Sequence, residues 1–393
     1  MTVLHTLQTL RVALCIVLGA GSVAAKAPAG MHKVRDVVIY EDARFHCAFP
    51  SVVKRPDGEV LVAFRRAPNR LIYGEELNYH VDPNSYLVIV SSRDDGLTWT
   101  PEPRLLYADA FGGSQDPGLL QLRDGTLLCT SYGWTFIRPD GIPHLKQPVT
   151  HHPPGAVFNG GYYVRSTDGG QTWDGPLYPP HIPPEILNGP TREPVPAYNR
   201  GALIEGRDGR LFWVVAATEQ VDPQRTGTYL LISEDKGLTW RYSCPVGTDP
   251  KVTFNETSIY ETPQGDLVAF LRTGGYEDQA CIARSTDGGK SFQPWEGMGF
   301  QGHPLHALRL PDNRVLLTYG YRHEPMGIRA RILNAECTDY ATAPEIVLRD
   351  DGGGFDLGYP WSVMLDDTHV LVTYYFNQPG RVPYIAGTIL AIQ

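Results

Sequence analysis

Basic residues are in the minority along this chain of 393 residues, in which 34 Lys and Arg stand against 43 Asp and Glu. The formal net charge of −9 disfavours a nucleic-acid-binding protein, because phosphate neutralisation requires a basic surface. Long apolar runs are absent after the first 27 residues, so the sequence predicts no membrane span. No Gly-rich phosphate loop stands in a βαβ setting, and we therefore expect no nucleotide cofactor.

Cysteine is also scarce, with six residues in the whole chain. There is no CxxC pair and no zinc-type spacing of Cys and His, so the sequence predicts no metal site. Five cysteines lie beyond the first 27 residues, most of them beside strand-like segments, where we expect buried free thiols. They are Cys47, Cys129, Cys244, Cys281 and Cys337.

Residues 1–27 have the pattern of a secretory signal peptide. Arg11 precedes an apolar run over 12–18, and the segment 25–27 fits an A-x-A cleavage site. The apolar run is too short to anchor the chain as a transmembrane helix. The sequence therefore predicts a secreted or periplasmic protein in which residues 28–393 form a single domain.

Glycine and proline are abundant, with 41 and 33 residues, and they mark many tight turns. One pattern recurs six times: an apolar strand, a two-residue turn and a second apolar strand. Asp-Gly and its variants supply the positive φ values of type I′ hairpins. These turns lie at 57–58, 124–125, 208–209, 264–265, 312–313 and 367–368. A period of about 50 residues with insertions predicts an all-β fold, a six-bladed β-propeller with four-stranded antiparallel blades. We expect a strand near Ile39 to complete the last blade.

A second repeat, S-x-D-x-G-x-T-W, runs in phase with the first. It occurs at 92–99, 166–173 and 233–240, with a close variant at 285–292. The Asp can cap its own turn, the Gly takes a positive φ, and the aromatic residue packs into the blade. We interpret these Asp residues as hairpin architecture rather than as catalytic groups.

These repeats are Asp boxes, and through them the chain resembles the sialidase, or neuraminidase, superfamily from about Ile39 to its C-terminus. The resemblance implies that Tyr359 is the nucleophile, polarised by Glu256, and that Asp82 on a mobile loop is the acid/base. Glu75 and Glu76 compete with Asp82 for that role. A neutral phenol suits a sugar whose anomeric carbon carries a carboxylate, because that carboxylate would repel an attacking Asp or Glu. We expect Glu256 and Tyr359 to lie within hydrogen-bond reach, with Asp82 across the pocket.

Arginines are expected to hold the substrate carboxylate, because a guanidinium group binds a carboxylate in bidentate fashion. The resemblance implies Arg272, with Arg322 and Arg329 as further candidates from the fifth blade. The family's first arginine would stand two residues before Pro50, where this chain has Ala48. The candidates to replace it from adjacent strands are Arg44, Arg65, Arg66 and Arg200. If none does so, the carboxylate clamp is incomplete and the sugar is not an ordinary sialic acid.

Asp116 and His303 precede their inner strands as Glu256 does, and are further pocket candidates by symmetry. Three functions compete. The first is a secreted retaining exo-glycosidase of sialidase type that releases a terminal acidic sugar without a cofactor. The second is a glycosidase or lyase of the same fold acting on an arabinan or a uronic-acid glycan, which Ala48 favours. The third is a non-catalytic propeller that binds a glycan or a protein, which the ordered set around Tyr359 disfavours. In the first two, the partner is a carbohydrate.

Overall fold

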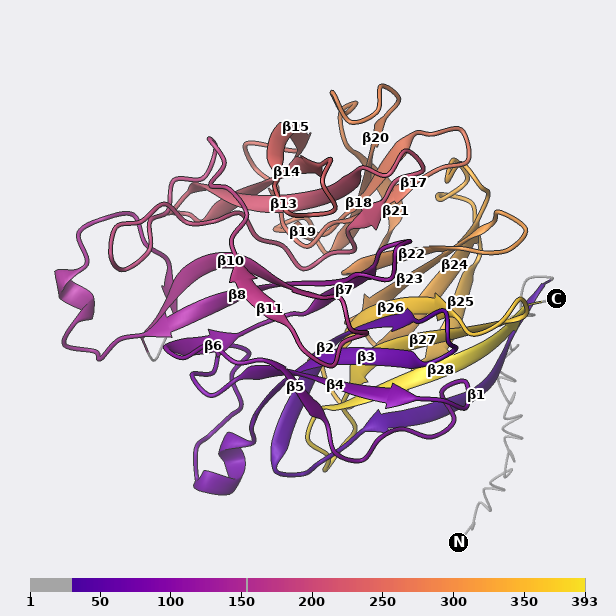
Figure 1. The fold of residues 1–393 in the computed structure, drawn as a ribbon, viewed down its shortest axis with the longest axis horizontal. Coiled ribbons are helices and arrows are strands. Elements are labelled where there is room, and N and C mark those ends of the chain that lie inside the picture. The colour runs from indigo at the N-terminus through magenta and orange to yellow at the C-terminus, as the bar shows by residue number, and fades with distance from the viewer. Residues whose placement is uncertain (1–29, 153–154, 393) are drawn as a thin grey trace, which may run out of the picture.

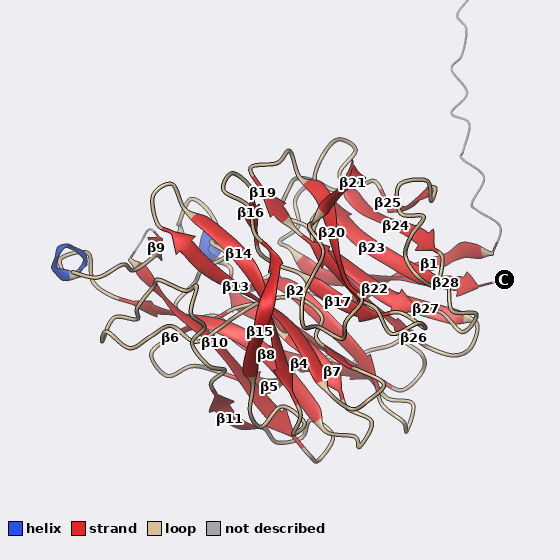
Figure 2. Cartoon of the chain, turned by 90° about the horizontal axis from the view of Figure 1, so that it is seen from above, coloured by secondary structure: helices blue, strands red, loops and turns tan. Residues whose placement is uncertain are grey.

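The computed structural model describes residues 30–152 and 155–392, so the predicted signal peptide lies outside the described residues. Antiparallel β-sheets make up almost all of this part of the chain (Figure 1). Helix in the described residues is limited to two short 3₁₀ segments, η1 (Arg70–Tyr73) and η2 (Ile142–His144), as Figure 2 shows. No helix in the described ranges has the length and apolar character needed to cross a bilayer.

Six sheets form the six blades of a β-propeller, as the turn pattern predicted. The strand order from the inner to the outer edge follows the chain in blades 1 to 5. Blade 1 consists of β2 (Phe45–Lys54), β3 (Val60–Pro68), β4 (Tyr86–Ser92) and β5 (Arg104–Tyr107). Blade 2 consists of β6 (Gly112–Ser114) and β7 (Gly118–Gln121), which both pair with β8 (Leu127–Phe136), then β10 (Ala156–Ser166) and β11 (Asp174–Leu177), with β9 (His151–His152) on β10.

The remaining blades repeat this arrangement. Blade 3 contains β12 (Ile204–Glu205), β13 (Leu211–Gln220), β14 (Arg225–Ser233) and β15 (Arg241–Gly247). Blade 4 contains β17 (Ser258–Glu261), β18 (Leu267–Leu271), β20 (Gln279–Ser285) and β21 (Glu296–Gln301), beside a small pair formed by β16 (Thr253–Phe254) and β19 (Thr273–Gly274). Blade 5 contains β22 (Leu305–Arg309), β23 (Val315–Tyr321), β24 (Gly327–Leu333) and β25 (Glu345–Arg349).

Blade 6 closes the ring by combining both ends of the chain. It contains β26 (Gly358–Met364), β27 (His369–Phe376), β28 (Tyr384–Ile392) and, at its outer edge, β1 (Met31–Tyr40). β1 pairs with β28 from Met31 opposite Ile392 to Tyr40 opposite Ile385, and Figure 1 shows the two strands side by side. The expected strand near Ile39 is therefore confirmed, and it covers an edge that would otherwise be unpaired.

Both sequence repeats form turns where they were predicted, but the six hairpin turns are not of type I′, because that type needs a positive φ at both central residues and none of the six has it. Each of the six two-residue turns joins the innermost pair of strands that flanks it, for example β2 with β3 and β26 with β27. Gly58 takes a φ of 87°, a conformation that disfavours residues with a side chain. The Asp boxes join the third and fourth strands of their blades, and Asp235 accepts hydrogen bonds from Ser233 Oγ and the Thr239 backbone N–H, both at 2.8 Å.

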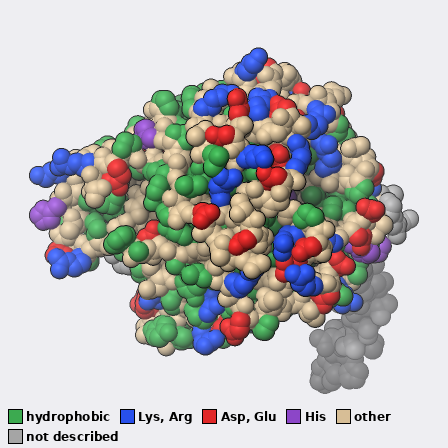
Figure 3. Space-filling model, in the orientation of Figure 1, with side chains coloured by type: hydrophobic (Ala, Val, Ile, Leu, Met, Phe, Trp, Pro, Cys, Tyr) green, Lys and Arg blue, Asp and Glu red, His purple; other side chains and the backbone are tan. Residues whose placement is uncertain are grey.

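The apolar core lies between the blades. A separate cluster of buried side chains fills the space between each pair of neighbouring blades, including blades 6 and 1, where Phe64 and Leu371 belong to one cluster. The five cysteines are all buried free thiols, as expected. On the face in Figure 3, acidic and basic side chains are interspersed rather than gathered by sign.

Candidate active site

The starts of the inner strands bring polar residues from different blades together. Neighbouring inner strands contact one another around the ring, β2 with β7 and β26, and β17 with β12 and β22. Residues just before or at the start of these strands therefore surround the propeller axis. They are Asp116 before β7, Arg200 before β12, Glu256 before β17, His303 before β22 and Tyr359 in β26.

Tyr359 enters this centre from an irregular backbone. Its φ is 55°, and the pairing of β26 with β27 shifts register between Gly358 and Trp361, which marks a bulge. A bulky residue with positive φ is uncommon and costs about 1–3 kcal/mol, and such strain is concentrated at functional sites. Phe49 in β2 has a φ of 60° at a similar register shift, and its ring lies 4.7 Å from that of Tyr359.

Tyr359, Glu256 and Arg272 form one hydrogen-bonded group. The Tyr359 hydroxyl donates to Glu256 Oε1 at 2.6 Å, and Arg272 Nη1 donates to the Tyr359 oxygen at 2.8 Å. Arg272 Nη1 also donates to Glu256 Oε2. The Glu256–Tyr359 distance lies within the reach that the sequence predicted, although the two residues are 103 positions apart.

The protonation states of this group follow from its surroundings. Burial raises the pKa of Tyr359 far above its ordinary value of 10.0, although the Arg272 charge opposes the shift. Burial alone would also raise the pKa of Glu256, but the Arg272 charge and the Tyr359 hydrogen bond outweigh it and hold the pKa below 4.5. At neutral pH the phenol is therefore protonated while its hydrogen-bond acceptor is ionised. Glu256 is placed to accept the phenolic proton.

Three guanidinium groups surround the Tyr359 ring. Their Cζ atoms lie 4.7 Å from the ring centroid for Arg200, 5.6 Å for Arg322 and 5.8 Å for Arg272. Arg322 donates to the Leu357 carbonyl and to the Tyr375 hydroxyl, both at 3.0 Å. Such cation–π contacts are worth about 2 kcal/mol when desolvated, and they favour negative charge on the phenolic ring.

Arg200 supports Tyr359 from within the protein. It is only 1% exposed, and its Nη2 donates to the carbonyl of Tyr359 at 3.0 Å and to that of Pro50 at 3.1 Å. Its Nε and Nη1 have no hydrogen-bond partner among the described residues. The contacts make Arg200 a support for the backbone and ring of Tyr359.

The other predicted cations have different partners. Arg65 is fully buried and approaches His46 Nδ1 at 3.4 Å, while Arg66 stacks 3.6 Å from the centroid of Phe45. Arg44 pairs with Asp42, and Arg329 donates to the carbonyl of Pro325. His303 is buried, and burial together with the charges of Arg272 and Arg322 lowers its pKa to about 2, so its imidazole is neutral.

An alanine, Ala48, stands at the sequence position where the resemblance places the family's first arginine. Ala48 is fully buried in β2, opposite Arg65. The next residue, Phe49, places its ring against Tyr359, Tyr375 and His80, with centroid distances of 4.7, 5.2 and 5.2 Å. An aromatic wall therefore stands beside the nucleophile candidate.

Asp116 lies in the same buried region. Its Oδ2 accepts from the Tyr132 hydroxyl at 3.1 Å, and its Oδ1 has no partner within the described part of the chain. Burial, together with the negative charge of Glu256, raises its pKa to about 7. A cavity of about 310 Å³ opens beside this region, which is a size suited to a small ligand. Its lining includes Tyr132, Trp134, Tyr198, Asn199, Arg200 and Glu256.

Asp82, the predicted acid/base, is held in a bidentate ion pair. Arg70 donates Nε to Asp82 Oδ2 at 2.7 Å and Nη2 to Oδ1 at 2.8 Å, and the Asn84 backbone N–H donates to Oδ1 at 2.8 Å. The side chain is 3% exposed. The alternative acid Glu75 also lies on this loop and is 3.5 Å from Arg70 Nη1. The Asp82 carboxylate is therefore engaged in the structure of its own loop.

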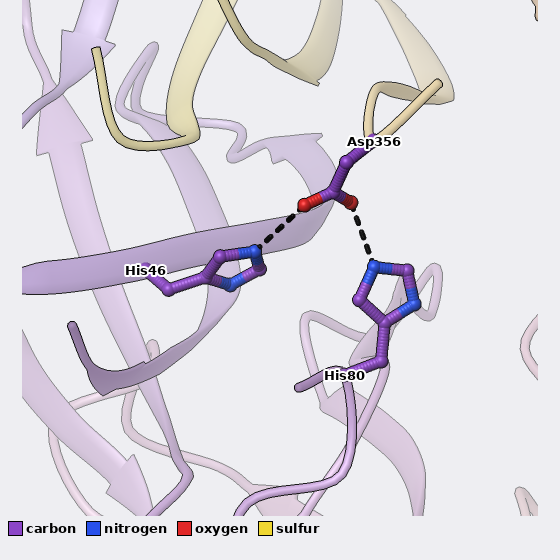
Figure 4. Close-up of side chains that lie close together, drawn as sticks. All are labelled: His46, His80 and Asp356. Carbon is purple, nitrogen blue, oxygen red and sulfur yellow. Dashed lines mark hydrogen bonds and ion pairs between the residues drawn. The ribbon is translucent and has the colours of Figure 1, made fainter. Parts of the chain in front are cut away.

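A second carboxylate joins two histidines beside Phe49 (Figure 4). His46 Nε2 lies 3.0 Å from Asp356 Oδ2, and His80 Nε2 lies 2.7 Å from Asp356 Oδ1. One nitrogen of each histidine and one oxygen of Asp356 lie within 4.8 Å of one another, close enough to ligate a single metal ion. Arg65, however, approaches His46 Nδ1 and can donate only to a lone pair there, which leaves the proton on Nε2. This contact favours a hydrogen bond from His46 Nε2–H to Asp356 over a metal bond from the same nitrogen.

Asp356 is the site residue that the sequence analysis missed. It lies three residues before Tyr359, in the loop that leads into β26. Burial alone would raise its pKa, but the hydrogen bonds from His46 and His80 hold the pKa far below its ordinary value. Its place just before an inner strand, which it shares with Asp116 and Glu256, is the signal that could have identified it.

Comparisons with known proteins agree with this architecture. The family model of the BNR repeat-like domain matches residues 149–372. A crystal structure of a protein of unknown function from Dyadobacter fermentans is 66% identical, with a TM-score of 0.91, covering 93% of this chain and 100% of its own. The Hadza microbial sialidase Hz136 is 18% identical, with a TM-score of 0.62 over 88% of this chain and 65% of its own.

A structure of the Penicillium chrysogenum α-L-arabinanase in complex with arabinobiose is also similar. It is 15% identical, with a TM-score of 0.61 over 91% of this chain and 98% of its own. At these identities the sialidase and the arabinanase share the fold with this chain. No curated protein sequence matches it.

Proposed function

This chain belongs to the BNR repeat-like family, and from that premise we propose that it is a secreted retaining exo-glycosidase. Its fold relatives include glycoside hydrolases. The observation that carries the proposal is the hydrogen-bonded group of Tyr359, Glu256 and Arg272 beside a cavity. A binding module has no need of a buried carboxylate that accepts a phenolic proton.

In the proposed reaction, Tyr359 attacks the anomeric carbon of a terminal sugar. Its proton passes to Glu256, and the Tyr359 oxygen bonds to carbon while the glycosidic C–O bond breaks toward the departing group. Arg272, Arg200 and Arg322 favour the phenolate character that develops during attack. Water then releases the sugar from Tyr359, which regains its proton from Glu256. Two displacements at one carbon retain the configuration.

The first candidate substrate is a terminal sialic acid or another sugar with a carboxylate on its anomeric carbon. A phenol avoids the charge repulsion that a carboxylate nucleophile would meet there. The guanidinium groups of Arg272 and Arg322 both contact the Tyr359 ring, and they can bind the carboxylate of such a sugar. A substrate with an anomeric carboxylate therefore explains why the nucleophile is a tyrosine.

The second candidate substrate is a sugar without that carboxylate, such as an arabinan end or a uronic-acid glycan. Ala48 stands where the resemblance places a cation, and the ring of the next residue, Phe49, contacts that of Tyr359 at 4.7 Å. Without an arginine at position 48, Arg272 and Arg322 are left to bind a substrate carboxylate, and two guanidinium groups bind it more weakly than three. An aromatic wall suits the apolar face of a sugar ring.

The test is a panel of 4-methylumbelliferyl glycosides offered to the purified protein lacking residues 1–27. The panel contains the α-sialoside, the α-L-arabinofuranoside and the β-glucuronide. Release from the sialoside alone supports the first substrate, and release from either of the others alone supports the second. Tyr359→Phe should abolish release, because it removes only the attacking oxygen. A wild-type protein that binds glycans but releases no sugar would refute the proposed function in favour of a binding propeller.

A further inference from the structure

The proposed reaction needs a proton donor in addition to Tyr359 and Glu256. A retaining glycosidase needs a group that protonates the leaving oxygen and then deprotonates the incoming water. In an exo-acting enzyme the leaving group points out of the pocket, so this group must lie at the rim. Asp82 is 3% exposed, and Arg70 and the Asn84 N–H occupy both of its carboxylate oxygens.

Asp116 is equally unsuited to that position. It is 1% exposed, and it lies among Tyr132, Arg200 and Glu256 on the inner side of the centre. A group there can contact the bound sugar but is remote from solvent and from an outward leaving group.

His80 has the exposure that the role requires. Its side chain is 40% exposed, whereas that of His46, on the same carboxylate, is 1% exposed. The His80 ring packs edge-on against Phe49 at a centroid distance of 5.2 Å, and the Phe49 ring also contacts that of Tyr359 at 4.7 Å. Phe49 therefore contacts both His80 and the nucleophile candidate.

Asp356 orients the His80 imidazole. Nε2 lies 2.7 Å from Asp356 Oδ1 (Figure 4). The same oxygen accepts a hydrogen bond from the Tyr375 hydroxyl at 3.0 Å. The backbone is anchored as well, because Gln115 Nε2 donates to the His80 carbonyl. With Nε2–H directed at the carboxylate, Nδ1 is the nitrogen left to exchange a proton. Nδ1 has no hydrogen-bond partner among the described residues.

We propose that His80, oriented by Asp356, is the general acid/base of this enzyme in place of Asp82. The proposal rests on the proposed function and adds its proton-transfer group. Asp356 is a positioning residue, since it acts through the imidazole. His46 satisfies the second oxygen of Asp356 from the buried side and takes no part in proton transfer.

The proton balance of the two steps is complete. In the first step His80 Nδ1–H protonates the leaving oxygen as the glycosidic bond breaks and the bond to Tyr359 forms. His80 is then neutral. In the second step Nδ1 removes a proton from water, the water oxygen bonds to the anomeric carbon, and the electron pair of the sugar–Tyr359 bond returns to the phenolic oxygen. His80 ends as it began, and no oxidant or metal is required.

The experiment compares leaving groups. The probes are the 4-nitrophenyl glycoside and the methyl glycoside of whichever sugar the wild-type protein releases from the panel. His80→Gln keeps an N–H for Asp356 but cannot transfer a proton. We expect kcat/KM for the methyl glycoside to fall about 10²–10⁴-fold, while the 4-nitrophenyl glycoside loses less than about tenfold in the bond-breaking step. Azide should accelerate nitrophenol release by this variant by replacing the water that needs a base.

Matched variants separate this role from a structural one. His46→Gln changes the other histidine on Asp356 and should affect both substrates equally, with no azide effect. Asp356→Asn should show the selectivity of His80→Gln with a smaller loss, because an amide oxygen still accepts the Nε2–H. Melting temperatures establish that each variant is folded.

The outcomes are distinguishable. Equal losses on both substrates in His80→Gln would overturn the role of His80. Leaving-group dependence and azide rescue in Asp82→Asn instead would assign the acid/base to Asp82. A wild-type protein that releases no sugar from any glycoside would refute the proposed function, and the role of His80 with it.

Discussion

Glu256→Gln tests the proton transfer on which the proposed chemistry depends. The Tyr359 hydroxyl donates to Glu256 at 2.6 Å, and burial raises the Tyr359 pKa far above 10.0. Attack at neutral pH therefore requires a base. A glutamine retains the shape and the hydrogen-bond acceptor of Glu256, but it cannot take the proton. Loss of a general base costs about 10²–10⁴ in kcat, or roughly 3–5 kcal/mol of barrier.

The pH dependence of this variant has a defined sign. The Glu256 charge is one of the causes that raise the Tyr359 pKa, so its removal lowers that pKa. Below the pKa, the phenolate fraction grows about tenfold for each pH unit. We therefore expect kcat of Glu256→Gln to rise steadily between pH 7 and 10, because the phenolate can attack without a base.

The assay measures initial rates on the fluorogenic substrate that the wild-type protein cleaves, from pH 5 to 10. Removing Glu256 leaves Arg272 with an uncompensated charge, which costs about 3–5 kcal/mol of stability, so circular dichroism must show folded protein at each pH. Tyr359→Phe is the control and should stay inactive at every pH. A Glu256→Gln rate within tenfold of wild type at pH 7, or a loss that does not diminish as pH rises, would refute the base assignment.

Three further predictions address neighbouring groups. Arg272→Lys should lower kcat/KM about 10–100-fold, with both a higher KM and a lower kcat. An ammonium group cannot replace the planar guanidinium group, and one charge-assisted hydrogen bond is worth about 1.5–3 kcal/mol. Unchanged kinetics would contradict this prediction. Asp116 has a folded-state pKa of about 7 against an ordinary 3.8, so the stability of the wild-type protein should fall as pH rises from about 4 to 7. Asp116→Asn should therefore raise the melting temperature at pH 8 and change it little at pH 4, and a larger gain at pH 4 would show that the sign is wrong. Asp235→Ala removes the hydrogen-bond acceptor of an Asp-box turn and should lower the free energy of unfolding by about 1–2 kcal/mol, while kcat per folded molecule stays unchanged. A loss of kcat would instead assign that Asp box a role in catalysis.

The blades of the propeller were predictable because their signals are local. A hairpin turn such as 57–58 needs a positive φ at a defined position, and the residues that supply it stand next to each other in the chain. The Asp boxes are equally local, since the Asp235 carboxylate accepts its hydrogen bonds in the described part of the chain from residues within four positions of itself. Six repetitions of the hairpin pattern are compatible with few architectures other than a closed ring of blades. Glu256 and Tyr359 were predicted from the resemblance to the sialidase superfamily, and Asp116 and His303 were then predicted from their equivalent positions in other blades.

Partnerships across the ring were decided only by the tertiary structure. The sequence shows that Arg200 precedes an inner strand, but its place beneath Tyr359, 159 positions away, depends on how the blades pack. Asp82 resembles an acid/base in sequence, yet Arg70, twelve positions earlier, occupies its carboxylate. His80 and Asp356 lie 276 positions apart and meet because blades 1 and 6 are neighbours in the closed ring. The sequence determines which chemical groups the side chains carry. The closed ring determines which distant loops come within hydrogen-bond distance, and this decides the partner of each side chain and therefore its charge state and role.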